Sequence, residues 1–358
     1  MPSPSSHALI VATALLALFV VIPVAADIPD GYQTPPQAIV DIVDQAMTPQ
    51  VQFGPDESRA LMLDWRSLTS IEELSEEELR LAGLRFRPAI DGPSRVRPFT
   101  GLAVLDVATG RQTPVRGLPD GSRFINLEWS PDGRHASFTR LTADGVELWV
   151  VDLHEAVTRA LTGPIVSLTA DIEPLWIDTE TVVAALVDPD RGAPPRESRV
   201  PKGPVVQENQ GEKAAARTFQ DLLQNSHDEA LFDYYMTTRL ASIRLDGSIT
   251  KLGKPAIYWA VEPSPNGEYL LVETLHRPYS YLVPAFRFPM RSEVWTRDGE
   301  PVHLAYDRPL QESIPIAFGS VSTGPRQITW RNDTPATLVW AEAQDGGDAA
   351  AEAEIRDT

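Results

Sequence analysis

The sequence predicts an all-β fold in which short sheets are arrayed around a common axis, as the blades of a β-propeller are. Three observations support this prediction. A tight turn rich in proline, Asp or Asn and glycine recurs along the chain, usually after an aromatic residue. A second, Asp-Gly type of hairpin follows several of its copies. The 32 prolines and 22 glycines provide too many turns for a helical bundle.

The first type of hairpin joins two apolar strands. Proline presets one turn dihedral, the Asp or Asn side chain caps the turn, and glycine takes a left-handed position that costs other residues about 1 kcal/mol. An aromatic side chain before the turn supplies a large buried anchor. Copies of this hairpin lie at residues 51–63, 127–138, 175–183, 261–272 and 329–340. The anchors are Phe53, Trp129, Trp176 and Trp330.

The second type of hairpin places Asp-Gly or a similar pair between alternating strands, which is a strong hairpin signal. Its copies lie at residues 103–111, 148–153, 241–248 and 293–300. Two hairpins per repeat make a four-stranded sheet, the unit of a propeller blade.

The spacing of the repeats indicates insertions. The anchor positions 53, 129, 176, 263 and 330 are 76, 47, 87 and 67 residues apart, whereas a blade takes about 40–50. A β-sandwich would also show many short strands, but it gives no reason for one unit to return. We therefore assign residues 51–345 to a partial propeller of about five repeats, an incomplete ring.

Two insertions have helical patterns. In residues 70–82, Ser75 and Glu78 have capping-box spacing and Gly83 is a stop signal. Residues 212–238 are expected to hold two short helices, the second begun by a capping box of Ser226 and Glu229. The proline-rich residues 188–204 are expected to form an extended loop.

The amino terminus resembles a signal peptide over residues 1–26. Residues 8–24 form an apolar run without charged side chains, and small residues precede Asp27. Cleavage there predicts a periplasmic or secreted chain that is no longer attached to a membrane. The alternative is an uncleaved anchor, because about 17–25 apolar residues can span a bilayer. A lead segment, residues 27–50, follows, with a short helix expected over 35–47.

Composition excludes several kinds of partner and site. The 31 Lys and Arg against 50 Asp and Glu give a charge of −19, which disfavours nucleic acids and anionic membrane surfaces. The chain has no cysteine, so it forms no disulfide, thiol nucleophile or cysteine-ligated metal site. The six histidines show no zinc motif, and no glycine-rich phosphate loop follows a strand. No metal or cofactor is therefore expected.

Catalytic motifs are missing from the sequence as well. The chain has no Gly-x-Ser-x-Gly, and the nearest string has the wrong spacing, so neither Ser320 nor Ser322 is expected to be a nucleophile. Residues 276–289 are more unusual, because they mix cations with aromatic residues at a strand end. Arg277 and Arg287 there could bind a carboxylate through the fork geometry of guanidinium, or could pair with the surplus acids of this chain.

Eight strings, most of them in the insertions, carry a family resemblance. They are 81–88, 191–195, 200–204, 217–223, 227–235, 275–280, 287–289 and 340–349. In this order they resemble the amino-terminal part of the glutamyl endopeptidases, a branch of the prolyl oligopeptidase superfamily of serine peptidases. The resemblance runs from about Tyr32 to about Ala350.

The resemblance implies a seven-bladed propeller followed by an α/β-hydrolase domain with a Ser, Asp and His triad. The propeller would admit peptides and exclude folded proteins, while the hydrolase domain cuts after glutamate. Recognition of glutamate needs a cation, for which Arg277 is the first candidate and Arg287 the second. Peptide substrates would therefore be partners through a domain missing from this chain.

The chain departs from this pattern at its carboxy terminus. Residues 346–358 are either an acidic tail or a truncation point, and the chain alone is expected to be inactive. Open blade faces would leave apolar surface in water, so self-association is expected. The alternatives are a stand-alone periplasmic propeller that binds without catalysis and an inactive pseudopeptidase.

Overall fold

The computed structural model describes residues 34–170, 172–197, 219–314 and 318–358. The chain divides into two units between Gln45 and Ala46, and the described part of the first unit is residues 34–45. The first contains helix α2 (Gln37–Val43), which lies within the predicted lead helix and buries none of its residues. The predicted signal peptide lies outside the described residues. In the described ranges, no helix is long and apolar enough to cross a membrane.

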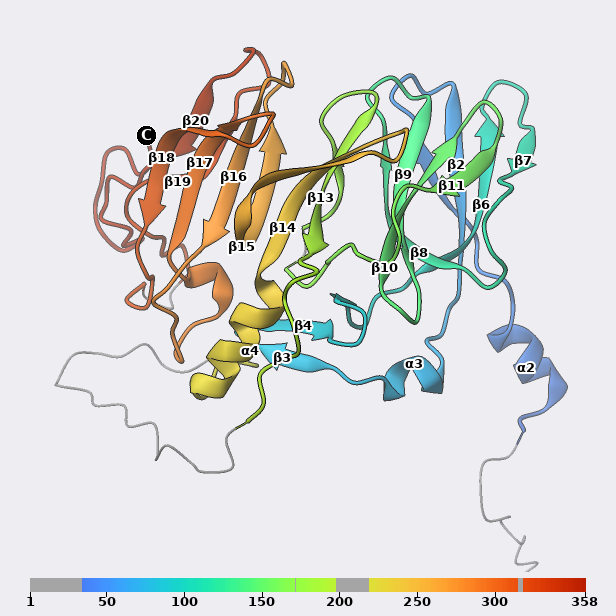
Figure 1. Cartoon of the computed structure of the whole chain (residues 1–358), viewed down its shortest axis with the longest axis horizontal. Coiled ribbons are helices and arrows are strands. Elements are labelled where there is room, and N and C mark those ends of the chain that lie inside the picture. The colour runs from blue at the N-terminus through green and yellow to red at the C-terminus, as the bar shows by residue number, and fades with distance from the viewer. Residues whose placement is uncertain (1–33, 171, 198–218, 315–317) are drawn as a thin grey trace, which may run out of the picture. The chain divides into compact units, whose positions relative to one another are not determined.

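Residues 46–358 form successive antiparallel sheets in chain order, which we call blades 1 to 5 (Figure 1). Blade 1 contains β1 (Gln50–Phe53), β2 (Arg59–Trp65), β6 (Phe99–Asp106) and β7 (Gln112–Pro114). Blade 2 contains β8 (Arg123–Trp129), β9 (His135–Leu141), β10 (Val146–Asp152) and β11 (Val157–Ala160).

Blades 3 and 4 share one long strand. Blade 3 contains β12 (Leu175–Trp176), β13 (Thr181–Val187), β14 (Thr238–Arg244) and the first half of β15 (Ile249–Pro263). Blade 4 contains the second half of β15, then β16 (Tyr269–Leu275), β17 (Met290–Thr296) and β18 (Pro301–Arg308). Blade 5 contains β19 (Arg326–Trp330) and β20 (Leu338–Ala341). The predicted all-β propeller of about five repeats is confirmed.

Ser130 of blade 2 and Ser264 of blade 4 occupy matching positions in their turns. In blade 2, the Ser130 N–H donates to the His135 carbonyl at 2.9 Å, and the His135 N–H donates to the Ser130 hydroxyl at 3.0 Å. In blade 4, Ser264 and Tyr269 make the same two bonds at the same two distances. The recurring sequence therefore encodes a recurring local structure.

In blades 1, 2 and 4, the last residue of the turn has a left-handed backbone conformation, with positive φ. Gly133 has φ +67° and Gly267 has φ +69°, whereas blade 1 places Glu57 there with φ +56°. Only glycine adopts this region at no steric cost. The turn of blade 1 is therefore strained relative to its counterparts.

The tryptophan anchors occupy equivalent places, as the sequence predicts. Trp129, Trp176 and Trp330 each end the first strand of a blade and are 8%, 7% and 5% exposed. The Trp176 indole N–H donates to the Glu128 carbonyl at 3.1 Å. The Trp330 indole N–H donates in the same way to Glu262 at 3.1 Å. Each acceptor directly precedes the anchor position of the preceding blade.

The anchor of blade 1 differs from the others. Phe53 is 56% exposed, whereas Trp129 of blade 2 is buried against Gly54 of blade 1. A Cβ atom on Gly54 would lie 2.7 Å from the Trp129 ring, so this close approach requires glycine. An anchor is buried by the blade that precedes it.

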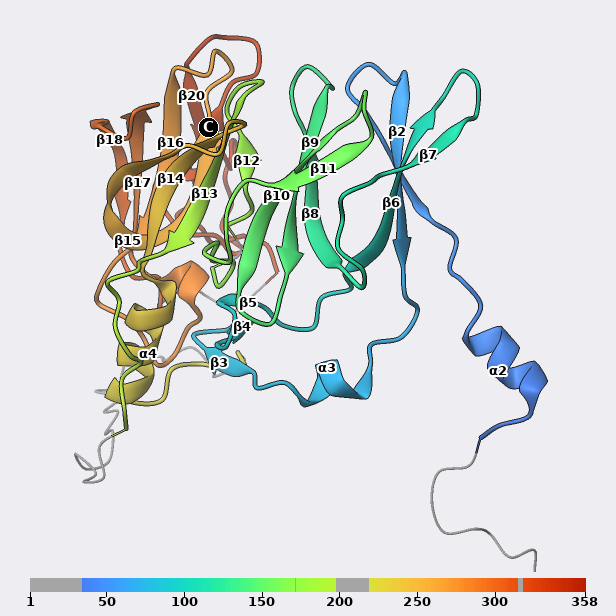
Figure 2. The same ribbon diagram turned by 45° about the vertical axis from the view of Figure 1, so that its right-hand side comes forward.

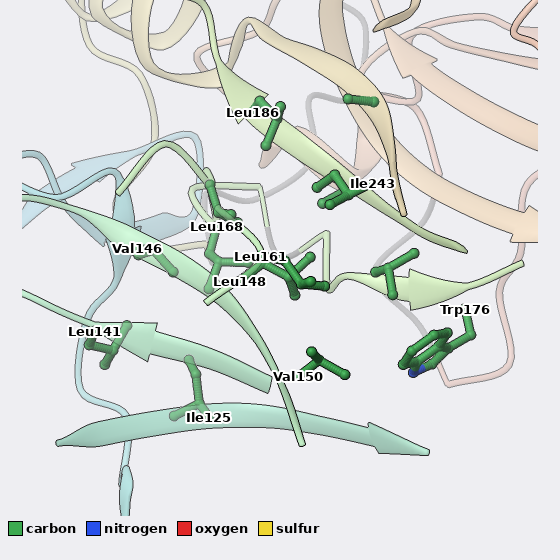
Figure 3. Close-up of a cluster of buried hydrophobic side chains, with 14 residues drawn as sticks. Ile125, Leu141, Val146, Leu148, Val150, Leu161, Leu168, Trp176, Leu186 and Ile243 are labelled. Atoms are coloured by element: carbon green, nitrogen blue, oxygen red, sulfur yellow. The ribbon is translucent and has the colours of Figure 1, made fainter. Parts of the chain in front are cut away.

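Each pair of successive blades encloses its own apolar core. Figure 3 shows the core between blades 2 and 3, where Leu148 and Val150 of β10 belong to one buried cluster with Leu186, Ile243 and Trp176 of blade 3. Corresponding clusters join blades 1 and 2, blades 3 and 4, and blades 4 and 5. Face-to-face packing of neighbouring sheets is the defining contact of a propeller.

Three insertions connect the second strand of a blade to its third strand, and they gather at the same end of the molecule (Figures 1 and 2). We call their described residues, 66–98, 188–197, 219–237 and 276–289, the insert cap. Its elements are α3 (Ile71–Ser75), β3 (Leu79–Leu81), β4 (Leu84–Arg87), β5 (Gly92–Pro93), α4 (Ser226–Met236) and the 3₁₀ turn η1 (Ala285–Arg287).

The prediction of one helix over residues 70–82 is wrong. Helix α3 ends at Ser75, its capping box is Ser70 with Glu73, and residues 79–87 form the β3–β4 hairpin. Both turn residues of this hairpin, at positions 82 and 83, have positive φ, as a two-residue turn requires. Burial of Leu81 and Phe86 in the cap determined the outcome, because tertiary packing overrides helix propensity.

The prediction for residues 212–238 is only partly confirmed. Helix α4 is present, but its N-cap is Asn225, whose side chain accepts from two backbone N–H groups, so the predicted capping box of Ser226 and Glu229 is wrong. Residues 219–225 are not helical, and residues 198–218 lie outside the described residues. In the predicted acidic tail, Thr358 pairs with Glu342 through two backbone hydrogen bonds.

Candidate functional site in the insert cap

The insert cap contributes most of an apolar core that is distinct from the cores between blades, and strand residues such as Ile257 and Leu275 complete this core. Buried side chains come from all three insertions, among them Phe86, Leu223, Phe232, Val283 and Phe288. Aromatic rings pack edge to face within it, as where Phe232 meets Phe288 with centroids 5.7 Å apart. The cap is therefore a packed body and not a set of separate loops.

Backbone hydrogen bonds also join the insertions. The Gly83 N–H donates to the Asp221 carbonyl at 2.9 Å, which links blade 1 to blade 3. The Ala285 N–H donates to the Ala82 carbonyl at 2.7 Å, which links blade 4 to blade 1. Gly83 has φ +85°, and a Cβ atom there would lie 2.7 Å from Pro284, so the site requires glycine.

Arg277, the first candidate for recognising glutamate, is already paired inside the chain. Its guanidinium donates to Glu229 at 2.5 Å and to Asp233 at 2.7 Å. Both carboxylates lie on one face of α4, four residues apart. The guanidinium also lies 4.4 Å from the centre of the Tyr279 ring. The structure thus shows the internal pairing that the sequence left open.

Two tyrosines complete this network. Tyr279 donates its hydroxyl proton to Asp233, and Tyr281 donates to Glu229 at 2.5 Å. The hydrogen bond to Glu229 and then burial raise the pKa of Tyr281 to about 12. Burial and then the hydrogen bond to Asp233 raise the pKa of Tyr279. Both hydroxyls therefore remain protonated donors at neutral pH.

Arg287, the second candidate, has a different environment. Its guanidinium lies 5.2 Å from the centre of the Phe219 ring, and its Nη1 is buried without a hydrogen-bond partner in the described part of the chain. Burial lowers the pKa of Arg287. A buried, unsatisfied guanidinium nitrogen favours an added anion.

The structure adds two ion pairs that the sequence analysis missed. Arg191 forms a bidentate pair with Asp91 at 2.7 and 2.8 Å, and Arg85 bonds Asp221 at 2.6 Å. The two pairs connect the insertions of blades 1 and 3 across 100 and 136 residues, respectively. No local spacing signals such pairs, although Arg191 and Arg85 lie in strings that carry the family resemblance.

In the described part of the chain, no three His, Asp or Glu side chains converge as metal ligands. Ser320 and Ser322 are described and have no histidine or carboxylate hydrogen-bond partner there. The polar groups that the cap provides are guanidinium groups, carboxylates and tyrosine hydroxyls, which lie beside aromatic rings.

Comparison with known proteins shows what the chain is similar to. No family model matches the chain. It is 41% identical over 340 residues to a protein from Oryza sativa subsp. japonica named probable glutamyl endopeptidase, chloroplastic, and this match covers 91% of the chain. The chain is therefore similar to the glutamyl endopeptidases over nearly all of its own length. A protein of the same name from Arabidopsis thaliana is 41% identical over 339 residues, again covering 91% of the chain.

The chain spans only 36% and 35% of the length of these two relatives. Among solved structures, the acylaminoacyl peptidase of Pyrococcus horikoshii is similar with a TM-score of 0.39 and 10% identity, covering 75% of this chain and 33% of that one. The family resemblance seen in the insertions is confirmed by the two curated relatives, whose similarity extends over 91% of this chain.

Proposed function

We propose that this chain is the propeller portion of a peptidase of the glutamyl endopeptidase type, and that it controls peptide access to a hydrolase domain on further polypeptide. The observation that carries the proposal is the 41% identity, which extends through 91% of the chain. The insert cap is the proposed peptide-facing surface. Loops and insertions on a rigid scaffold are the usual carriers of binding residues.

Within the cap, Arg287 is the stronger candidate for contacting a substrate carboxylate. Arg277 is committed to Glu229 and Asp233, whereas Arg287 has no carboxylate partner in the described residues. In an enzyme that joins this chain to a hydrolase domain, Arg287→Ala should reduce cleavage after glutamate more than cleavage after glutamine. Equal losses for the two peptides would remove Arg287 from this role.

The proposed division of labour has a direct test. The chain alone should neither hydrolyse a glutamate-containing peptide nor react with a fluorophosphonate probe for active serines. The coding sequence beyond the codon for Thr358 should continue, in this or a neighbouring frame, to a Gly-x-Ser-x-Gly motif. Hydrolysis by the chain alone would overturn the proposal. Peptide binding without such a continuation would favour the stand-alone binding module.

Self-association is proposed through the outer face of blade 1. Val51 and Phe53 on β1 are 42% and 56% exposed, although equivalent anchors in other blades are buried. Sedimentation velocity of the purified chain should show species larger than the monomer, and Phe53→Ser should reduce them. A monodisperse, cooperatively melting monomer would contradict this proposal.

Export also remains a proposal. The relatives carry chloroplastic names, whereas residues 8–24 of this chain form an apolar run followed by small residues. Amino-terminal sequencing of the protein from a bacterial periplasm should begin at Asp27. Recovery of the intact amino terminus in the cytoplasm would contradict export.

A further inference from the structure

A second cationic site lies in the insert cap, away from Arg277 and Arg287. It is a crevice of about 600 Å³ between α3, the β3–β5 strands and the start of β8. Its arginines are Arg80, Arg87, Arg95, Arg97 and Arg123, and its carboxylates are Glu73, Glu76 and Glu78. This excess of two positive charges occurs in a chain whose net charge is −19. The local charge is therefore opposite to that of the whole molecule.

The glutamates of the crevice are already occupied. Glu78 accepts from Arg80 at 2.8 Å and from Arg95 at 2.8 and 3.0 Å, and Glu73 accepts from Arg123 at 2.5 Å. Burial alone would raise the pKa of Glu78, but its hydrogen bonds outweigh burial and lower it. Burial would likewise raise the pKa of Glu73, but hydrogen bonds and the charge of Arg123 outweigh burial and lower it. The ion pairs of Glu73 and Glu78 therefore persist at neutral pH, and the arginines still outnumber the carboxylates.

Two arginines have unfilled capacity for an anion. Arg97 is exposed and has no carboxylate or carbonyl partner among the described residues, although its guanidinium lies 6.0 Å from the Trp65 ring. Arg87 pairs with Glu76, yet its Nε is buried without a partner in the same described ranges. Burial, followed by the nearby charge of Arg123, lowers the pKa of Arg87. An incoming carboxylate would offset both penalties.

The rim of the crevice is apolar. Leu68, Ile71 and Leu74 on α3 and the segment before it are 66%, 84% and 69% exposed. Leu74 lines the crevice, and Leu68 lines the adjoining hollow together with Arg66, another exposed arginine, which forms no ion pair with the described residues. A matching ligand presents carboxylates beside apolar side chains. A peptide fits this description, whereas a free phosphate fits only the charge.

We propose that this crevice binds an acidic segment of a peptide, with guanidinium groups holding its Asp or Glu side chains and the α3 rim holding apolar neighbours. The peptide as ligand rests on the proposed function. The site is separate from the proposed Arg287 contact because α3, β3 and β8 line it and η1 does not. It would retain a substrate at a distance from the cleaved bond.

The test is binding to the full chain, which needs no catalysis. Fluorescence anisotropy should show that a labelled peptide of alternating glutamate and leucine binds more tightly than its glutamine counterpart, and that added salt weakens binding. Arg97→Glu and Arg66→Glu should each weaken binding by about tenfold, a difference of about 1.4 kcal/mol. The matched control is Arg111→Glu, an exposed arginine at the β6–β7 turn, which should change affinity less than about twofold.

Three results would overturn the crevice. They are equal binding of the glutamate and glutamine peptides, unchanged affinity in both arginine variants, and displacement of the peptide by millimolar inorganic phosphate, which would indicate a phosphate site. Each of these results concerns binding at the crevice alone and would leave the proposed peptidase function standing. Arg287→Ala should leave binding at the crevice unchanged, so failure of one site does not imply failure of the other.

Discussion

The blades and the insert cap are stabilised in different ways. Blades depend on repeated strand ladders, matching serine turns and apolar cores between neighbouring sheets. The cap adds to its apolar core a network of ion pairs between segments far apart in the sequence, such as Arg191 with Asp91 and Arg277 with Glu229. The difference indicates that the blades supply the framework, whereas the cap carries the specific chemistry.

The largest expected effect lies in the framework. Trp176→Ala removes a buried indole and its hydrogen bond to the Glu128 carbonyl, so it should lower the free energy of unfolding by about 3–5 kcal/mol. Phe53→Ala is the matched control, because Phe53 holds the same position in blade 1 but is exposed, and it should cost less than about 1 kcal/mol. Urea unfolding measures both variants. Equal losses would show that the anchors are not buried by the preceding blade.

The next prediction compares the local stability of the cap with that of the blades. Arg277→Ala leaves Glu229 and Asp233 without their shared cation, and should destabilise the cap by about 1–2 kcal/mol, a modest value because the guanidinium is 52% exposed. Hydrogen exchange should accelerate in α4 and stay unchanged in β9 and β10. Arg134→Ala, at an exposed turn of blade 2, should change neither region. Uniform acceleration would mean that cap and blades unfold as one unit.

A smaller effect concerns pH. Burial would raise the pKa of Glu229, but hydrogen bonds from Tyr281 and Arg277 outweigh it and lower the pKa below the ordinary value of 4.5. Because the folded pKa is depressed, this contribution is present above pH 4.5 and is lost as pH falls through the folded value. Hydrogen exchange of α4, corrected for intrinsic rates, should show this acid loss in the parent chain and less of it in Arg277→Ala.

The alkaline side has the opposite sign. The pKa of Tyr281 is raised from 10 to about 12, so its contribution is fully present below pH 10 and is lost as pH rises through 12. Tyr281→Phe should remove this alkaline loss in α4 and leave the blade strands unaffected. Persistence of the same alkaline step in that variant would assign it to another group.

The smallest effect returns to the repeated turns. Glu57→Gly should stabilise the chain by about 0.5–1 kcal/mol, because glycine relieves the left-handed strain found in blade 1. The reverse change, Gly133→Ala, should destabilise by about 1 kcal/mol, since an added Cβ meets only ordinary contacts but φ stays at +67°. Thermal unfolding of both variants measures these two changes in stability. Destabilisation by Glu57→Gly would show that the three turns are not energetically equivalent.

The blades were predictable because their signals are local. Each serine turn and each anchor, such as Ser130 and Trp129, acts within a few residues, and repetition strengthens a weak signal. The continuation of β15 from blade 3 into blade 4 was not predicted. Gly253 (φ +58°) and Pro255 would ordinarily indicate a turn, but the strand continues through them as its pairing passes from β14 to β16.

The cap was much less predictable, because its structure depends on contacts between distant segments. Residues 79–81 have an acceptable helical pattern, and only the burial of Leu81 against other insertions makes them a strand. The sequence drew attention to Arg277, but its partners on α4 lie 44 and 48 residues away. Charge surplus predicted pairing in general, whereas the identity of the partners required the fold.

The bonds from Ala285 to Ala82 and from Gly83 to Asp221 also restrict motion. These bonds tether blade 4 and blade 3 to blade 1. The sheets therefore cannot move apart at the cap end unless one of these hydrogen bonds breaks. We therefore expect the blades to separate more easily at their opposite end, where short hairpins such as β6–β7 and β10–β11 connect the strands. A molecule threading between blades would meet the lower barrier on that side.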